Sequence, residues 1–274
     1  MIMSGKNQYK YYTDNNYSLW NGRANPHFKS EFYDVEGFKE GKTSLSSIEL
    51  EELGNVKEKS LLHLQCHFGQ DTLSWARRGA CVTGVDFSDS AIRIADSLSQ
   101  QLNIPADFIC ADIYNLPNIL KSKFDIVFTS YGVLKWLHNI QQWAEIVEFY
   151  LKPGGTFYLI EFHPFIYILD YELAEKISHS YFYNEEPICY EEIGSYAVPS
   201  SERTHTAYAW SHTISEVINA LLSTGLQLEF IHEFPFSTIN CFPFVIEGEQ
   251  GKYIHKKYPN MIPMLYSIKA IKQK

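Results

Sequence analysis

The chain has 274 residues, of which 45% are hydrophobic and 20% charged, as is typical of a globular protein with one substantial core. Its formal net charge is −9 at pH 7. Because binding to a phosphate backbone depends on clustered lysine and arginine, this acidity argues against nucleic acid as the main partner. No apolar run approaches the roughly 18 residues of a membrane span, and the first residues lack an apolar segment of signal-peptide length. We therefore expect a cytoplasmic protein that neither crosses a membrane nor is exported.

The five cysteines are an odd number and form no Cys-x-x-Cys pair, which fits neither a disulfide framework nor a zinc site. Cys66, Cys81 and Cys110 lie in or at the ends of predicted strands, so we expect small buried side chains rather than reactive thiols. The ten histidines are scattered without a repeated ligand spacing. We predict no metal site.

The first 42 residues are polar and aromatic, with little periodicity. We predict an N-terminal arm over residues 1–42, for which two roles are open. Its rings pack on the main domain, or it closes as a flap over a bound ligand and excludes water. A capping box, Ser46-x-x-Glu49, then predicts a short helix through Leu53 that Gly54 ends.

Residues 60–92 have the order strand, turn, helix, strand, acid. The short apolar run at 61–64 is typical of a buried strand, and the second strand ends at Asp86. In a parallel α/β sheet, this order places the turn at 65–69 against the N-terminus of a helix. An acid roughly 20 positions further on is placed to accept both hydroxyls of a ribose. The sequence therefore predicts a nucleoside-binding crevice.

The alternation of strands and helices continues through the middle of the chain. A third strand at 106–111 is followed by Asp112, a second acid at a strand end, and a fourth strand covers 124–130. A helix at 138–150 and a Lys-Pro-Gly-Gly turn lead into a fifth strand. Five strands alternating with helices predict right-handed crossovers and helices on both faces of the sheet.

With these motifs, residues 60–163 resemble the class I S-adenosylmethionine-dependent methyltransferases. Acids after strands two and three and the Lys-Pro-Gly-Gly turn carry the resemblance, and LHLQCHFGQDTL resembles a bacterial subfamily of small members. The resemblance implies an α/β fold with a Rossmann-like, doubly wound seven-stranded sheet of order 3-2-1-4-5-7-6, whose last strand is antiparallel. It implies S-adenosyl-L-methionine as cofactor and S-adenosyl-L-homocysteine as product.

One motif departs from the family. Many members carry acid-x-Gly-x-Gly-x-Gly, and those four places are His63, Gln65, His67 and Gly69 here. The usual acid would hold the methionine ammonium directly or through water, so that contact comes from elsewhere or is weaker. His63 lies within the strand and is more simply a hydrogen-bonded core histidine, whereas His67 either touches the cofactor or turns outward.

The resemblance assigns ten residues to the cofactor. Asp86 would bind the ribose, Phe87 would lie against the adenine, and Asp112 would receive the adenine amino group. For each acid the alternative is a helix cap or a turn. Gly69 permits close approach of the backbone. The full set is Gln65, Cys66, His67, Gly69, Asp86, Phe87, Ala111, Asp112, Ile113 and Thr129.

After residue 163 the pattern changes. Residues 164–210 are rich in tyrosine, phenylalanine and acids and are too long for an ordinary connection. We predict that they form an inserted cap over the acceptor site, within a methyltransferase domain at 43–274. A capping box, Thr213-x-x-Glu216, predicts a helix that Gly225 ends, followed by a sixth strand and, at the end of the chain, an alternating seventh.

Methyl transfer needs alignment more than a strong catalytic group, and it needs a base only if the acceptor is protonated. The candidate catalytic residues are His163, Tyr131 and His138, with Glu161 as a further possibility. Each has a structural alternative. His138 can start a helix, Glu161 can hydrogen-bond the cap, and His163 can belong to a turn.

The leading interpretation is a methyltransferase that moves a methyl group to an unidentified small-molecule acceptor by in-line displacement. Two alternatives are open. A noncatalytic protein that binds a nucleoside or S-adenosylmethionine is favoured by the altered glycine turn. An NAD-dependent oxidoreductase is disfavoured because the G-x-G-x-x-G spacing is absent. The sequence indicates neither the methylated atom nor the oligomeric state.

Overall fold

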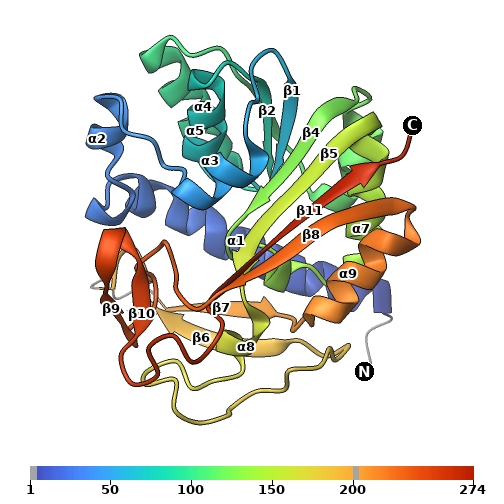
Figure 1. The fold of residues 1–274 in the computed structure, drawn as a ribbon. Coiled ribbons are helices and arrows are strands. Elements are labelled where there is room, and N and C mark those ends of the chain that lie inside the picture. Colours follow the sequence, from blue (N-terminus) through green and yellow to red (C-terminus); the bar gives the residue numbers. More distant parts are fainter. Residues whose placement is uncertain (1–4, 200–203) are drawn as a thin grey trace. The chain divides into compact units, whose positions relative to one another are not determined.

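The computed structural model describes residues 5–199 and 204–274. Its seven-stranded sheet has the order β3-β2-β1-β4-β5-β11-β8 (Figure 1). β11 (Leu265–Lys272) is antiparallel to both of its neighbours, β5 (Leu151–Phe162) and β8 (Leu226–Phe234). Since β8 and β11 are the sixth and seventh strands of this sheet along the chain, the predicted Rossmann-like order and the antiparallel last strand are confirmed.

The chain divides into two compact units. The first comprises the described residues up to Ser122 together with Glu186–Trp210, and the second comprises Lys123–Glu185 and Ser211–Lys274. The predicted cap at 164–210 is therefore divided between the units, and its residues 200–203 lie outside the described part of the chain, as do residues 1–4 of the predicted arm. The predicted domain boundaries stay predictions.

Parallel strands form the sheet of the first unit. β2 (Cys81–Asp86) lies between β1 (Ser60–Leu64) and β3 (Asp107–Cys110). The apolar side chains of β1 are fully buried, as expected for a parallel strand covered on both faces. The crossovers contain α4 (Gln70–Arg77) and α5 (Asp89–Leu102). The side chain of Ser88 caps α5 by accepting from the Ala91 N–H.

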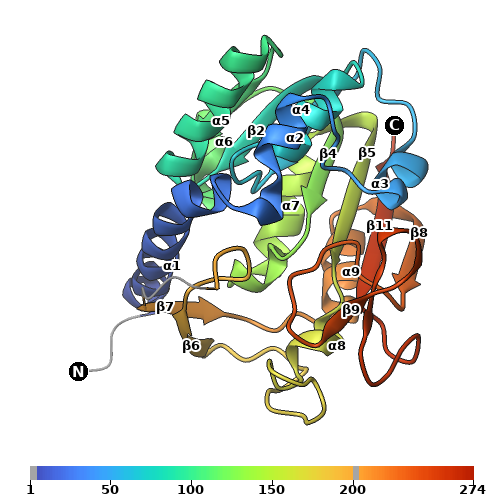
Figure 2. The same cartoon turned by 90° about the vertical axis from the view of Figure 1, so that its left-hand side faces the viewer.

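A helix of 24 residues, α1 (Gly5–Phe28), forms most of the arm. The sequence analysis did not predict it, because α1 is covered on several sides and its rings follow no single stripe. α1 lies beside α5 and β7 (Figure 2). Tyr17 contacts Phe87 just before α5, Tyr12 contacts Tyr208 of β7, and Trp20 contacts His67 in the turn after β1. The arm continues through η1 (Glu31–Tyr33), α2 (Val35–Lys39) and α3 (Ser47–Leu53).

A hairpin that the sequence analysis missed is attached to α1. β6 (Ile188–Ile193) and β7 (Thr204–Ala209) pair antiparallel as a separate two-stranded sheet. The Asn16 side chain donates to the Tyr208 carbonyl at 2.8 Å and accepts from its N–H at 2.9 Å. A neighbouring strand would make the same two hydrogen bonds with the backbone of Tyr208, so Asn16 extends the hydrogen bonding of β7 onto the helix.

In the second unit β4 (Phe124–Ser130) is parallel to β5. The Lys-Pro-Gly-Gly segment forms a bulge within β5 rather than a turn before it, because the pairing shifts from Leu151 to Thr156 along β4. Gly154 takes up the positive φ of +78° that this bulge requires. This unit contains the helices α7 (Ile140–Tyr150) and α9 (Ile214–Ser223), and α9 has the predicted capping box.

Short elements complete the described chain. They are η2 (Ile113–Asn115), α6 (Leu116–Ile119), η3 (Leu134–Trp136), α8 (Pro164–Tyr167), β9 (Val245–Glu247), η4 (Glu249–Gly251) and β10 (Tyr253–His255). Across residues 5–199 and 204–274, no helix is both long and apolar enough to cross a bilayer.

The expectation for the cysteines was wrong in two of three cases. Cys66 is buried, whereas Cys81 and Cys110 are exposed. Cys81 is the first residue of β2 and Cys110 the last of β3, the strand at one end of the sheet order. Strand ends and edge strands are less covered than strand centres, which the apolar pattern alone did not resolve.

Candidate functional site

The turn after β1 has an unusual backbone. Gln65, His67 and Gly69 all have positive φ, of +59°, +51° and +80°. This conformation costs an L-residue roughly 1–2 kcal/mol, so glycine is the usual choice. The chain thus keeps the backbone that the family's glycine pattern would give, although two of the three positions carry side chains. At Gly69 a Cβ would come within 2.7 Å of the Phe108 ring, so glycine is required there.

Asp86, the last residue of β2, joins this turn to α5. Its carboxylate accepts from the His67 N–H at 2.9 Å and from the Ser88 N–H at 2.8 Å. The residue is only 8% exposed, and burial raises the pKa of Asp86 to about 6. A carboxylate offers about four acceptor positions, so it can hold the turn and still accept from ligand hydroxyls. The acceptor positions that remain on the Asp86 carboxylate therefore fit the hydroxyls of a ribose.

The residues predicted for the adenine lie beside Asp86. Phe87 is half-buried, and its ring centroid is 6.0 Å from that of Tyr17. Ala111 donates its N–H to the Asp86 carbonyl at 2.9 Å, and both Ala111 and Ile113 are buried. Asp112 caps η2 by accepting from the Tyr114 N–H at 2.8 Å, so the structural alternative for this acid is present.

α1 is fastened to the start of α5 at this place. Asn21 accepts from the Ser88 hydroxyl at 2.6 Å and from the Ser90 N–H at 3.0 Å. Tyr17 donates to Asp89 at 2.7 Å, and this hydrogen bond, followed by that from Asn21, lowers the pKa of Asp89 to about 2. Tyr17 and Asn21 were missed from the sequence, because α1 has no motif and lies about 70 residues from α5 along the chain.

His67 belongs to a chain of polar side chains that the sequence did not reveal. Its Nε2 lies 3.2 Å from Nδ1 of His27, whose Nε2 lies 3.0 Å from Oγ of Ser195. His27 is fully buried, and burial, followed by the neighbouring His67 and Arg23, lowers its pKa to about 2. Burial also lowers the pKa of His67 to about 3. Both rings are therefore neutral near pH 7.

His63 and Cys66 are core residues. Nδ1 of His63 lies 2.9 Å from the Thr72 hydroxyl, and burial lowers the pKa of His63 to about 3. His63 is thus the hydrogen-bonded core histidine that was expected. Burial raises the pKa of Cys66, so its side chain is a packed thiol and only its backbone is available to a ligand.

In the second unit, Thr129 and Tyr131 differ in accessibility. Thr129 is fully buried on β4, and its hydroxyl has no partner within the described residues. Such a side chain offers no surface to the cofactor, so this geometry does not support a direct contact. Tyr131 is half-buried, has a φ of +26°, and its hydroxyl accepts from Thr238 at 3.1 Å. Left-handed φ at a non-glycine residue is found most often where function requires it.

Glu161 explains the conformation at Tyr131. Its buried carboxylate accepts from the backbone N–H groups of Gly132, Val133 and Leu134, the last two at 2.8 and 3.0 Å. Burial raises the pKa of Glu161, and these hydrogen bonds oppose the rise. With its oxygens occupied by backbone donors, Glu161 fixes the loop after β4 rather than serving as a base.

His163 has both ring nitrogens engaged. Nδ1 accepts from the Phe165 N–H at 3.1 Å and caps α8, so Nε2 carries the proton and donates to Glu233 at 2.7 Å. Burial lowers the pKa of His163 despite Glu233. Both nitrogens of His163 are engaged in this geometry, as in the structural alternative, and its role as a base stays a prediction.

His138 is half-buried, and its carbonyl accepts from the Tyr183 hydroxyl at 3.1 Å. The cap of α7 is the next residue, Asn139, whose side chain accepts from the Gln142 N–H at 2.9 Å. The expected alternative role of His138 as the start of the helix therefore belongs to Asn139.

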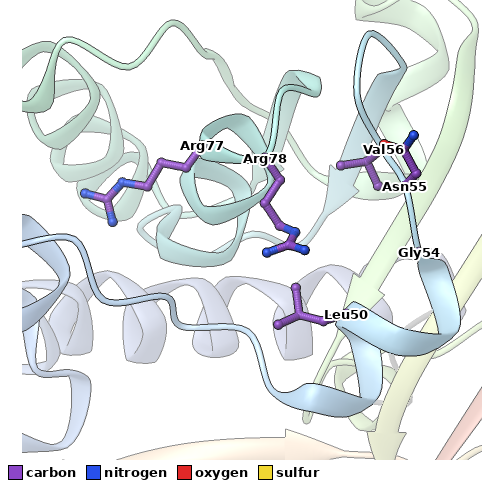
Figure 3. Close-up of a pocket in the computed structure, with 6 residues that line it drawn as sticks. All are labelled: Leu50, Gly54, Asn55, Val56, Arg77 and Arg78. Carbon is purple, nitrogen blue, oxygen red and sulfur yellow. The ribbon is translucent and has the colours of Figure 1, made fainter.

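A pocket of about 540 Å³ lies elsewhere in the first unit (Figure 3). Its lining residues are Leu50, Gly54, Asn55, Val56, Arg77 and Arg78. Arg78 points toward Leu50, while Arg77 points away and donates to the carbonyls of Phe38 and Lys42. The pocket lies where the chain enters β1, whereas the predicted cofactor turn follows the end of β1. It is therefore separate from the candidate cofactor site. Within residues 5–199 and 204–274, no cluster of three or more His, Cys, Asp or Glu could hold a metal ion.

Comparison with known proteins agrees with this arrangement. Residues 61–155, which contain the turn and both strand-end acids, match a family described as a methyltransferase domain. Residues 61–155 are therefore similar to a known methyltransferase domain. The ubiquinone biosynthesis O-methyltransferase of Coxiella burnetii is 30% identical over 109 residues, which are 40% of this chain and 46% of that protein. The chain thus spans about half the length of the curated relatives it matches.

Two solved structures share the fold of this chain. A SAM-dependent methyltransferase from Methanosarcina mazei has a TM-score of 0.56 at 19% identity, covering 84% of this chain and 98% of that one. Geranyl diphosphate C-methyltransferase from Streptomyces coelicolor, solved with S-adenosyl-L-homocysteine, has a TM-score of 0.52 at 13% identity, covering 82% and 74%. At these identities the likeness concerns the fold.

Proposed function

We propose that the protein is an S-adenosylmethionine-dependent methyltransferase that acts on a small molecule. The observation that carries the proposal is the turn at 65–69, whose backbone is held in the left-handed form at three positions and bonded to Asp86. Keeping that backbone at Gln65 and His67 costs free energy, and a ligand that needs the turn accounts for the cost. The methyltransferase domain match covers the same residues.

The proposed cofactor residues lie in the first unit. Asp86 would accept from the ribose hydroxyls, Phe87 would lie against the adenine, and the turn around Gly69 would approach the methionine part through its backbone. When bound, S-adenosylmethionine supplies an electrophilic methyl group on a sulfonium, so the acceptor atom bonds to carbon as the carbon–sulfur bond breaks. α1, fastened to α5 through Asn21, would exclude water from the nucleoside.

For the acceptor we propose Tyr131 as the contacting residue in the second unit. Its half-buried side chain and the following backbone, which Glu161 fixes, support this role. His163 would act through α8, as a positioning residue. Because the Coxiella burnetii relative is an O-methyltransferase, a hydroxyl group is the first acceptor to test.

Calorimetric titration with S-adenosylmethionine, S-adenosylhomocysteine and NAD tests the proposal. We expect the first two to bind and NAD not to bind. Asp86→Ala should weaken S-adenosylhomocysteine binding at least tenfold, because a charged acceptor of two hydroxyls is removed. Binding of NAD alone, or unchanged affinity in the variant, would contradict the proposal.

A noncatalytic binding protein stays the second candidate, because both nitrogens of the candidate base His163 are engaged. Transfer of a labelled methyl group to any member of a panel of hydroxyl compounds excludes it. Tight cofactor binding without transfer to any tested acceptor would favour it.

A further inference from the structure

The family's acid is absent from β1, so the cation on the methionine part of the cofactor needs another acceptor. His67 lies at the edge of the sheet that carries the proposed cofactor site, because its main-chain N–H donates to Asp86, the residue proposed to bind the ribose. The imidazole is partly exposed and surrounded by the rings of Trp20, Tyr33 and Phe68, with centroids at 5.5, 5.6 and 4.4 Å. Its Nε2 faces His27, while its Nδ1 has no hydrogen-bond partner in the described part of the chain.

The hydrogen-bond chain His67–His27–Ser195 can run in two directions. If Ser195 donates to His27, His27 donates to Nε2 of His67, and Nδ1 of His67 carries a proton. If His67 donates from Nε2, His27 donates to Ser195, and Nδ1 of His67 presents a lone pair. Ser195 Oγ already accepts from the Val198 N–H at 3.1 Å, so it serves as an acceptor in this loop. A cation at Nδ1 selects the second direction.

We infer that Nδ1 of His67 accepts a hydrogen bond from the ammonium group of the cofactor, and that His27 and Ser195 hold His67 in the tautomer this requires. The inference rests on the proposed function. A neutral imidazole is needed, because an imidazolium would repel the ammonium. Burial among aromatic rings is the main cause that keeps His67 neutral. His27 and Ser195 touch no ligand and are positioning residues.

The test compares three ligands on wild type and His67→Gly. Glycine suits the φ of +51° and keeps the N–H that binds Asp86, so the ribose contact is preserved. S-adenosylhomocysteine carries ammonium and carboxylate, decarboxylated S-adenosylhomocysteine carries the ammonium alone, and 5′-methylthioadenosine carries neither. We expect His67→Gly to weaken binding of the first two about tenfold or more and to leave 5′-methylthioadenosine within twofold.

Each other outcome has a distinct meaning. Loss for S-adenosylhomocysteine alone would mean that His67 donates to the carboxylate, which overturns the inference. Equal loss for all three ligands would mean a general disturbance of the turn and also overturns it. If wild type binds none of the three, the proposed function itself fails. His232→Gln, which removes an exposed imidazole on β8, is the matched control and should change nothing.

The tautomer gives a second readout that does not depend on affinity. In ¹⁵N-histidine spectra of the S-adenosylhomocysteine complex, His67 should be protonated at Nε2 and unprotonated at Nδ1. Ser195→Ala removes the acceptor at the end of the chain His67–His27–Ser195, so it should populate the other tautomer of His67. The variant should bind S-adenosylhomocysteine about threefold more weakly and 5′-methylthioadenosine with unchanged affinity. A proton at Nδ1 of His67 in the wild-type complex would overturn the inference.

Discussion

At the scale of single residues, backbone conformation and side-chain space make separate demands on a glycine. Gly69 and Gly225 both have left-handed φ, of +80° and +86°. A Cβ at Gly69 would lie 2.7 Å from the Phe108 ring and 3.1 Å from the Ala95 Cβ, whereas a Cβ at Gly225 would meet nothing within 4 Å. The two sites therefore separate the cost of φ from the cost of a clash.

Gly69→Ala should destabilise the protein by roughly 2–4 kcal/mol, combining the cost of φ with displacement of a packed ring. Gly225→Ala should cost only about 1 kcal/mol, because φ alone is involved. Urea unfolding of both variants measures the difference. Equal losses would mean that Phe108 moves freely and that the turn is not tightly packed.

At the scale of elements, two polar side chains add hydrogen bonds to segments that also pack through apolar side chains. Glu161 collects three consecutive N–H groups after β4, and Asn21 joins α1 to the start of α5. In both cases one side chain satisfies several backbone or hydroxyl groups, so its removal leaves buried donors without acceptors. Each contact has a matched control in the chain.

Glu161→Gln should lower the free energy of unfolding by about 2–3 kcal/mol, since an amide supplies fewer acceptors and turns N–H donors toward N–H donors. Turnover should fall with it because Tyr131 loses its fixed backbone. Glu233→Gln should cost less than about 1 kcal/mol, because Glu233 is exposed and the amide oxygen can still accept from His163. Comparable losses of stability in the two variants would mean that Glu161 does not fix the loop after β4.

Asn21→Ala should speed amide hydrogen exchange in α1 about tenfold to hundredfold and shorten the lifetime of bound S-adenosylhomocysteine. Asn15 lies on the same helix, and its side chain donates at the surface to the Tyr11 carbonyl, so Asn15→Ala should leave both measurements unchanged. Unaltered exchange in the Asn21 variant would mean that α1 is held by its rings alone.

At the scale of the whole molecule, buried neutral histidines make the fold sensitive to acid. His27 and His63 are buried, with pKa values of about 2 and about 3, whereas an unfolded chain protonates histidine near 6.5. The unfolded state therefore binds more protons below pH 6.5, and stability falls as pH falls toward the folded values. Asp86, with its raised pKa of about 6, acts in the opposite sense between about pH 6 and 4.

Between pH 7 and pH 5, the free energy of unfolding of His63→Gln should fall by roughly 2 kcal/mol less than that of the wild type. The variant lacks a buried histidine that binds a proton in this pH range only when the chain is unfolded. The glutamine oxygen can accept from Thr72 in place of Nδ1. Urea unfolding at the two pH values gives the comparison. Parallel losses in variant and wild type would mean that His63 is protonated in the folded state.

The sequence predicted most of the sheet, because its strands are short apolar runs bounded by turns. The run at 61–64 and the run at 124–130 match β1 and β4 within one residue. The capping boxes predicted the starts of α3 and α9 for the same local reason. Long-range features were not predicted. α1 has no periodicity, and nothing near His27 or Ser195 indicates that they meet.

The candidate site divides in the same way. Asp86 and the turn follow from strand order, but the engagement of His163 by Glu233 and Phe165 depends on contacts that no motif encodes. The exposure of Cys81 and Cys110 depends on where strands end in the folded sheet. Local pattern placed the groups along the chain, while their hydrogen-bond partners depended on tertiary contacts.

The attachment of the hairpin β6–β7 to α1 has a kinetic consequence. α1 holds the hairpin through Asn16 and the start of α5 through Asn21. Any displacement of α1 from α5 therefore carries the hairpin with it. Under the proposed function, the cofactor would exchange only while the hairpin is displaced as well, so release of S-adenosylhomocysteine and amide exchange in β7 would depend on the same motion.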